Sequence, residues 1–239
     1  MTVEQRARLR HQEEIEALPL QGARLQQLVD RDLGAEHVMS YRLTVDPKAS
    51  ASHSHAGVEE ALYVVQGLGE IRVETSSYPV KRGQAVFVPA GAEHSYRNSG
   101  VERLIIVGAL APPVASADPA VAPALMDEQR IPPTVMGERN FRVLVSPEVG
   151  CRSMTQFTGI IPTGHAPLHA HPHEEAVYII SGRGRLWIED QSVGELRPGS
   201  VVFFPIGVRH TLENTGEEPL KVLGAFSPAG SPEAKLPSK

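Results

Sequence analysis

Residues 83–94 read GQAVFVPAGAEH, and residues 199–210 read GSVVFFPIGVRH. Each stretch is an apolar run that leads through Pro-x-Gly to a histidine, with glycine, proline, glycine and histidine at the same places in both. The two stretches lie 116 residues apart, counted from Gly83 to Gly199 or from His94 to His210. An apolar run bounded by glycine and proline is typical of a buried β-strand that ends in a turn. The pair therefore predicts two β-rich domains of the same kind.

The repeat extends well beyond these two stretches. The same separation relates His53 to His169, whereas Glu60 and Glu175 lie 115 residues apart, a difference that one loop residue explains. A period of this length exceeds the roughly 20–50 residues of a solenoid unit and indicates a duplicated domain. The predicted division is a short N-terminal extension at 1–23, a first domain at 24–110, a Pro/Ala-rich linker at 111–139, a second domain at 140–226 and a flexible tail at 227–239.

The composition favours an all-β protein. Of 239 residues, 21 are glycine and 20 are proline, while 41% are apolar, so turns are frequent and a core can still form. Within each half, turn residues interrupt short apolar runs every 8–12 residues or so, which is typical of a β-sandwich or barrel. The charged segment before residue 24 is expected to be a helical or irregular extension on the surface.

Several classes of partner are disfavoured. The net charge of −5 gives no electrostatic reason to expect a nucleic acid. The first residues lack the apolar run of a signal peptide, and no apolar stretch is long enough to span a membrane. Cys151 is the only cysteine, so an intrachain disulfide is excluded. We expect a cytoplasmic protein with no nucleic-acid or membrane partner.

Each half carries three histidines and a glutamate in the same order. Two histidines at i and i+2 on a strand point to the same face, so both imidazoles can reach one metal ion. A carboxylate from a neighbouring strand and a histidine from the return strand bring the ligands to four, which leaves two positions of an octahedral ion open. Without a metal, these buried polar groups would have to satisfy one another. The predicted ligand sets are His53, His55, Glu60 and His94, and His169, His171, Glu175 and His210.

Glu60, rather than its neighbour Glu59, is predicted to be the ligand of the first half. Glu60 precedes Gly67 by the same spacing as Glu175 precedes Gly182. The segment between the second histidine and the glutamate is one residue longer in the first half, which a loop at the strand end can absorb. Glu59→Gln is accordingly expected to be benign, and Glu60→Gln to weaken metal binding.

At these residues each half resembles the cupin superfamily. Its first motif is His-x-His followed by a glutamate, six residues and a glycine; its second is Gly, five residues, Pro-x-Gly, two residues, His, three residues and Asn. Both halves match both motifs, through Gly67 and Asn98 in the first and Gly182 and Asn214 in the second. The resemblance implies a bicupin, two tandem jelly-roll barrels with a metal in each barrel mouth. Fe(II) or Mn(II) is the expected ion, with Ni, Cu or Zn as alternatives.

The resemblance leaves the reaction open, because cupins host many chemistries. The first hypothesis is a non-haem metal dioxygenase acting on a small chelating substrate such as an enol, diketone, catechol-like molecule or hydroxy acid. The alternatives are a Lewis-acid isomerase, decarboxylase or hydrolase, and a binding module without catalysis. Oxalate decarboxylases carry an arginine three residues before the first motif histidine. Ser50 and Ala166 stand there instead, which disfavours oxalate.

Two further expectations concern partners and neighbouring histidines. The expected partner is a small-molecule substrate, and a homodimer is plausible because cupin barrels often pair their sheets and the segment 24–41 could cover an edge strand. His165 and His173 flank the second His-x-His. Each could be a group that orients a ligand or an additional ligand, with a surface position as the favoured interpretation.

Overall fold

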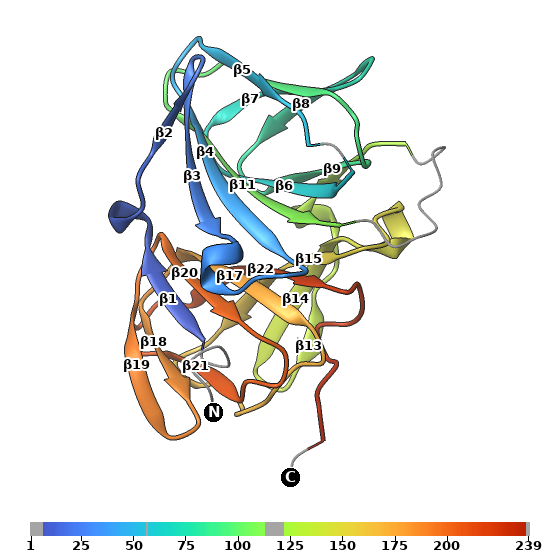
Figure 1. Cartoon of the computed structure of the whole chain (residues 1–239). Helices are drawn as coiled ribbons and strands as arrows, with labels where there is room; N and C mark the ends of the chain where they lie inside the picture. The colour runs from blue at the N-terminus through green and yellow to red at the C-terminus, as the bar shows by residue number, and fades with distance from the viewer. Residues whose placement is uncertain (1–6, 56, 113–121, 238–239) are drawn as a thin grey trace.

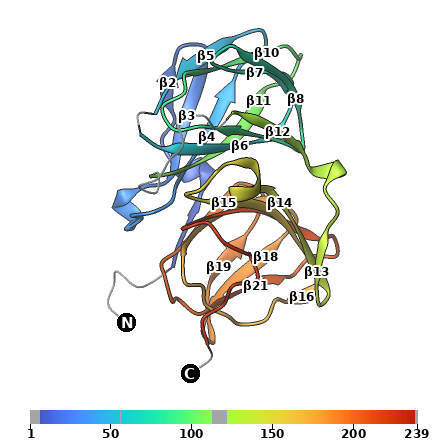
Figure 2. The same cartoon turned by 90° about the vertical axis from the view of Figure 1, so that its right-hand side faces the viewer.

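Two β-barrels follow one another along the chain and lie one on the other (Figure 1), as the perpendicular view also shows (Figure 2). The computed structural model describes residues 7–55, 57–112 and 122–237. Within these ranges the only helices are three-residue 3₁₀ turns, none of which is long or apolar enough to cross a membrane. They are η2 (Gln12–Glu14), η3 (Arg31–Leu33), η4 (Glu128–Arg130) and η5 (Pro147–Val149).

Each barrel is a jelly roll built from a seven-stranded and a four-stranded sheet. In the first barrel the larger sheet has the order β12 (Ala124–Asp127), β9 (Gln84–Val88), β6 (Glu59–Gln66), β11 (Leu104–Ala111), β4 (Met39–Val45), β3 (Ala23–Val29), β2 (Leu18–Leu20). The smaller sheet has the order β5 (Ser50–His53), β10 (His94–Asn98), β7 (Leu68–Val73), β8 (Ser76–Lys81).

The second barrel repeats this arrangement. Its larger sheet has the order β1 (Arg8–His11), β20 (Ser200–Phe204), β17 (Glu174–Ser181), β22 (Leu220–Ser227), β15 (Thr155–Ile161), β14 (Arg139–Val145), β13 (Thr134–Met136). Its smaller sheet has the order β16 (Gly164–His165), β21 (His210–Asn214), β18 (Gly184–Ile188), β19 (Gln191–Leu196). The prediction of two tandem all-β barrels is therefore confirmed.

The two halves exchange their first strands. β1 pairs with β20 of the second barrel, and β12, which occupies the equivalent place in the repeat, pairs with β9 of the first. The expected helical or irregular extension thus contributes β1 and β2, and the expected linker contains β12 and β13. Strands this short show no clear period of two, and their partners lie far away in the sequence, so the local pattern did not reveal them. Each exchanged strand covers a sheet edge that would otherwise be open.

The apolar runs are explained by sheets that are buried on both faces. Along β6, Leu62 and Val64 face the interior of the first barrel, whereas Ala61 and Tyr63 face the second barrel. The same alternation on β17 sends Val177 into the second barrel and its neighbours into the interface. The two larger sheets therefore pack against each other through a shared apolar layer, and the strands read as nearly continuous apolar segments.

The C-terminal segment, expected to be flexible, packs against the second barrel over the residues that the structure describes. The backbone N–H of Leu236 donates to the carbonyl of Ala170 at 2.9 Å, and the Gly230 amide donates to the Thr155 hydroxyl. A segment rich in proline and lysine gives no local sign of such contacts, because they depend on groups supplied by the barrel.

Candidate metal centre

Four polar side chains of the second barrel converge from different segments. His169 and His171 lie in the irregular stretch before β17, Glu175 is the second residue of β17, and His210 begins β21. An isolated β-bridge joins His169 to His210, which brings the two ends of the sequence motif together. His171, Glu175 and His210 are buried, and His169 is half-buried.

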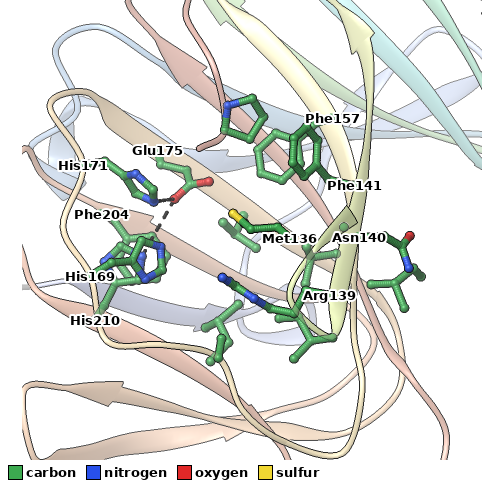
Figure 3. A pocket seen from close by; sticks show the side chains of 18 residues that line it. Met136, Arg139, Asn140, Phe141, Phe157, His169, His171, Glu175, Phe204 and His210 are labelled. Carbon is green, nitrogen blue, oxygen red and sulfur yellow. Dashed lines mark ion pairs between the residues drawn. The ribbon is translucent and has the colours of Figure 1, made fainter. Parts of the chain in front are cut away.

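The geometry of this cluster suits a common ligand. The candidate ligand atoms of the three histidines all lie within 4.8 Å of one another. Oε2 of Glu175 lies 3.5 Å from Nε2 of His171 and 4.0 Å from Nε2 of His210 (Figure 3). The other nitrogen of each ring, Nδ1, faces a backbone carbonyl, at 2.7 Å from Pro167, 2.8 Å from Ala234 and 2.9 Å from Val208. Because a carbonyl only accepts, Nδ1 carries the proton and Nε2 keeps its lone pair toward the cluster.

Burial favours the neutral form of two of the imidazoles, those of His169 and His210. Burial, and after it the neighbouring His171, lowers the pKa of His169 to about 4. Burial also takes the pKa of His210 well below its usual range and raises the pKa of the Glu175 carboxyl. Unprotonated imidazoles with converging lone pairs, beside a buried carboxyl group, are the donors that a divalent metal requires. The residues present therefore fit such an ion.

A pocket of about 80 Å³ opens beside the cluster. Its walls are largely apolar, with Phe141 and Phe157 on one side and Phe204 behind the histidines (Figure 3). Among the described residues that line it, Arg139 is the only charged side chain outside the cluster. The arrangement gives a small ligand an apolar enclosure with polar groups at defined points.

The corresponding residues of the first barrel are engaged with one another. β5 sets His53 opposite His94 in β10, although the side chain of His53 lies outside the described part of the structure. Nε2 of His94 is 3.0 Å from Oε2 of Glu60, and the hydroxyl of Tyr41 donates to Oε1 of the same carboxylate. Burial disfavours the charged imidazole, but the hydrogen bond and charge of Glu60 outweigh it and raise the pKa of His94. The ring centroid of His55 lies 6.3 Å from that of His94.

Two tyrosines distinguish the first barrel from the second. Tyr41 and Tyr96 are buried, and their hydroxyl oxygens are 3.1 Å apart. The repeat places Phe157 and Leu212 at the equivalent positions, where both line the pocket of the second barrel. Reasoning from the motifs missed this difference, although an alignment of the two halves contains it. The phenol groups of Tyr41 and Tyr96 therefore occupy a space in the first barrel, and form hydrogen bonds there, that is apolar and open in the second barrel.

The two flanking histidines have different environments. His165 is exposed and forms an ion pair with Glu213 at 3.3 Å, so the favoured surface position is confirmed for this residue. His173 is buried, and its ring stacks between His171 and Phe226, with centroid distances of 4.7 and 4.0 Å. The surface position is wrong for His173, because β17 begins at the next residue and draws the segment into the barrel wall.

Sequence comparison identifies the domain. The cupin domain family matches residues 41–108 and 157–226, which together cover more than half of the chain. The chain belongs to the cupin family. Each matched range contains all four residues of one predicted ligand set, and this cupin carries the domain twice in tandem.

Curated relatives match this cupin over part of its length. The polyketide synthase CurC of Streptomyces cyaneus is 30% identical over 92 residues, which are 37% of this chain and 60% of the relative. An uncharacterized protein of Methanocaldococcus jannaschii is 36% identical over 76 residues, which are 31% of this chain and 60% of that protein. The chain therefore spans about three fifths of the length of these curated relatives.

Solved structures match this cupin over nearly its whole length. Protein Ylba from E. coli superposes with a TM-score of 0.81 at 15% identity, covering 95% of this chain and 93% of the other. The oxalate decarboxylase of Lactobacillus farciminis, solved as a formate complex, superposes with a TM-score of 0.78 at 15% identity, covering 93% and 87%. At these identities the similarity establishes the bicupin fold.

Proposed function

We propose that the second barrel binds a divalent transition metal through His169, His171, Glu175 and His210. We further propose that the protein is a metal-dependent enzyme acting on a small chelating organic molecule. The supporting observation is the convergence of three imidazoles on a buried carboxyl group beside an apolar pocket. A donor set of three nitrogens and one oxygen suits Fe(II) or Mn(II), with Ni, Cu or Zn as alternatives.

When bound, such an ion would supply Lewis acidity and, if it is iron, reactivity toward dioxygen. The protein's own groups prepare the site. The carbonyls of Pro167, Ala234 and Val208 hold the imidazole rings in one tautomer and orientation. Phe141 and Phe157 wall the pocket, where they exclude water and hold a planar substrate in a reacting orientation.

Among metal-dependent enzymes, we favour a non-haem dioxygenase. The described lining of the pocket contains no acid–base side chain apart from the proposed ligands, since the guanidinium of Arg139 does not give up its proton in proteins. A Lewis-acid isomerase, decarboxylase or hydrolase has to move protons and needs a group that accepts and returns them. The composition of the pocket therefore supports a dioxygenase over these alternatives.

The four residues of the first barrel, His53, His55, Glu60 and His94, are proposed as a weaker site. Glu60 already accepts a hydrogen bond from Tyr41 and pairs with His94, so a metal would have to displace both contacts. A protonated His94 would also have to lose its proton before it could bind the ion. The second barrel is therefore proposed as the working centre.

The test is metal analysis of the full chain purified without added metal, followed by measurements of oxygen uptake. We expect about one equivalent of iron or manganese per chain, lost in His171→Ala and largely kept in His55→Ala. The iron-loaded protein should consume oxygen with a chelating enol, diketone, catechol or hydroxy acid. Failure to take up iron, manganese, nickel, copper or zinc would refute the metal site. Full metal content without oxygen uptake across the panel would refute the dioxygenase.

A further inference from the structure

Arg139 brings a positive charge into the pocket of the second barrel. It is the first residue of β14, directly after the tight turn from β13, and it is half-buried. Its guanidinium points across the pocket toward His169 and His210 (Figure 3). This side of the pocket faces the proposed metal, so a ligand that enters would meet the ion and the guanidinium together.

The guanidinium of Arg139 has no counter-ion among the residues that the structure describes. Across the described residues, no carboxylate lies within ion-pair distance of Arg139, and its side chain makes no hydrogen bond. Burial is the only cause that shifts its pKa, and it lowers it. Glu175, the carboxyl group that lines the same pocket, is directed to His171 and His210 instead. A cation that is partly removed from water without a partner is unfavourable, and an anionic ligand would relieve that cost.

The fold itself does not require this charge. The repeat places Ala23 at the equivalent position of the first barrel, where its methyl group is buried in the core. The same strand therefore begins equally well with an alanine. An arginine that the barrel architecture does not need, and that points into a pocket beside a candidate metal centre, has the geometry of a ligand-binding residue.

We propose that Arg139 binds a carboxylate of the substrate, so that the substrate is a small carboxylic acid with a second oxygen that reaches the metal. This inference rests on the proposed function and names its substrate class. A planar guanidinium offers two parallel N–H groups that match a carboxylate. The pocket of about 80 Å³ has room for roughly six non-hydrogen atoms, at 10–15 Å³ per water-sized group.

The test compares two probes that differ in charge and hardly in shape. Pyruvate and butane-2,3-dione are both small 1,2-dicarbonyl chelators, and only pyruvate carries a carboxylate. Their dissociation constants would be measured by calorimetry on the metal-loaded wild-type chain, on Arg139→Gln and on Arg139→Lys, with metal content determined first. Arg185→Gln is the matched control, because Arg185 lies on β18 of the same barrel and does not line the pocket.

We expect Arg139→Gln to weaken pyruvate binding by about 10- to 100-fold, while butane-2,3-dione binding stays unchanged. Arg139→Lys should recover part of the loss, and Arg185→Gln should match the wild type. Equal pyruvate affinity in the wild type and Arg139→Gln, or no binding of pyruvate to the metal-loaded protein, would overturn the inference while leaving the metal site intact. If the wild type holds no metal, the proposed function fails. The same titrations on the metal-free chain then decide whether Arg139 still selects the carboxylate.

Discussion

Glu59 and Glu174 occupy corresponding positions in the two barrels, and each carboxylate accepts hydrogen bonds from the opposite barrel across the interface. The Glu174 carboxylate of the second barrel accepts from three consecutive backbone N–H groups of the first, those of Glu36, His37 and Val38. The Glu59 carboxylate of the first barrel accepts from the Ser153 amide at 2.8 Å, the Ser153 hydroxyl and the Cys151 thiol of the second. Each of these glutamates directly precedes a proposed ligand, so the interface is anchored beside both candidate sites.

The paired contacts predict that Glu59→Gln and Glu174→Gln each lower the free energy of unfolding by about 1–3 kcal/mol, because an amide nitrogen replaces an oxygen that accepts several hydrogen bonds. Urea denaturation measures the loss. Glu36→Gln is the control, since it changes an exposed carboxylate and keeps the backbone N–H that Glu174 binds. If Glu59→Gln has the same free energy of unfolding as the wild type, the expectation from the sequence that this substitution is benign would hold. The buried hydrogen bonds argue against that expectation.

Removing the hydroxyl of Tyr41 is predicted to increase metal binding by the first barrel. Tyr41→Phe removes the hydroxyl that occupies Glu60 and copies Phe157 of the second barrel. We expect the metal content after loading to rise from about one toward about two equivalents per chain, measured by elemental analysis. Tyr178→Phe is the control, because its hydroxyl bonds to Gln12 in the interface, away from both clusters. An unchanged ratio in Tyr41→Phe would mean that Tyr41 does not limit the first site.

The docked C-terminal segment predicts that truncation weakens the second site. The Ala234 carbonyl receives Nδ1–H of His171, and Pro232 lines the pocket. Ending the chain at Gly230 should reduce metal affinity by about 10- to 100-fold, as losses of groups that orient metal ligands commonly do. Competition with a chelator measures the change. A chain that ends at Leu236 keeps these contacts and should bind like the wild type; equal affinity in both truncated chains would contradict the role of Ala234.

His173 is predicted to be dispensable for the metal. Its buried Nε2 has no hydrogen-bond partner among the described residues, and its ring stacks between His171 and Phe226. His173→Phe keeps the stacking and removes a buried polar atom that is not satisfied, so we expect unchanged metal content and stability equal to or about 1 kcal/mol above the wild type. Metal analysis with thermal unfolding decides this. Loss of metal in His173→Phe would make His173 a ligand.

The contacts of Glu128 predict how the free energy of unfolding depends on pH. Its carboxylate joins the barrels, accepting from Tyr63 at 2.7 Å and from Thr158 at 3.1 Å and pairing with Lys221 at 2.8 Å. Burial tends to raise the pKa of Glu128, but Lys221 and Tyr63 outweigh it and lower the pKa. The ionised carboxylate therefore stabilises the fold at pH values above the ordinary glutamate pKa of about 4.3, and this contribution is lost as pH falls through the lower folded value.

Urea denaturation of the wild type and Glu128→Gln at several pH values tests this dependence. The wild type should be the more stable protein by about 1–3 kcal/mol at pH 7, and the difference should shrink below about pH 4. The exposed Glu138→Gln serves as the control for a lost surface charge. A difference that is constant or grows in acid would show that the ionised carboxylate is not what stabilises the interface.

The sequence alone predicted the duplicated domain, the all-β barrels and the residues from which the candidate site is drawn. The repeated Gly, Pro, Gly and His of 83–94 and 199–210 carry this information because turns and ligands require particular residue types at fixed spacing. The convergence of His169, His171 and His210 follows from the same spacing once the strands pair. These features are local, or depend on matching one half of the chain against the other.

Tertiary structure alone decided which groups surround each cluster. The exchange of β1 and β12, the contact of Ala234 with His171 and the two interface glutamates all join groups that are far apart in the sequence and meet only after the barrels close. Strand register decides whether the side chain of Arg139 enters the pocket or faces solvent. A shift of one residue in the register would move every side chain of the strand to the other face of the sheet. Hydrogen-bond partners and facing are properties of the packed barrels, so a pattern along one strand does not contain them.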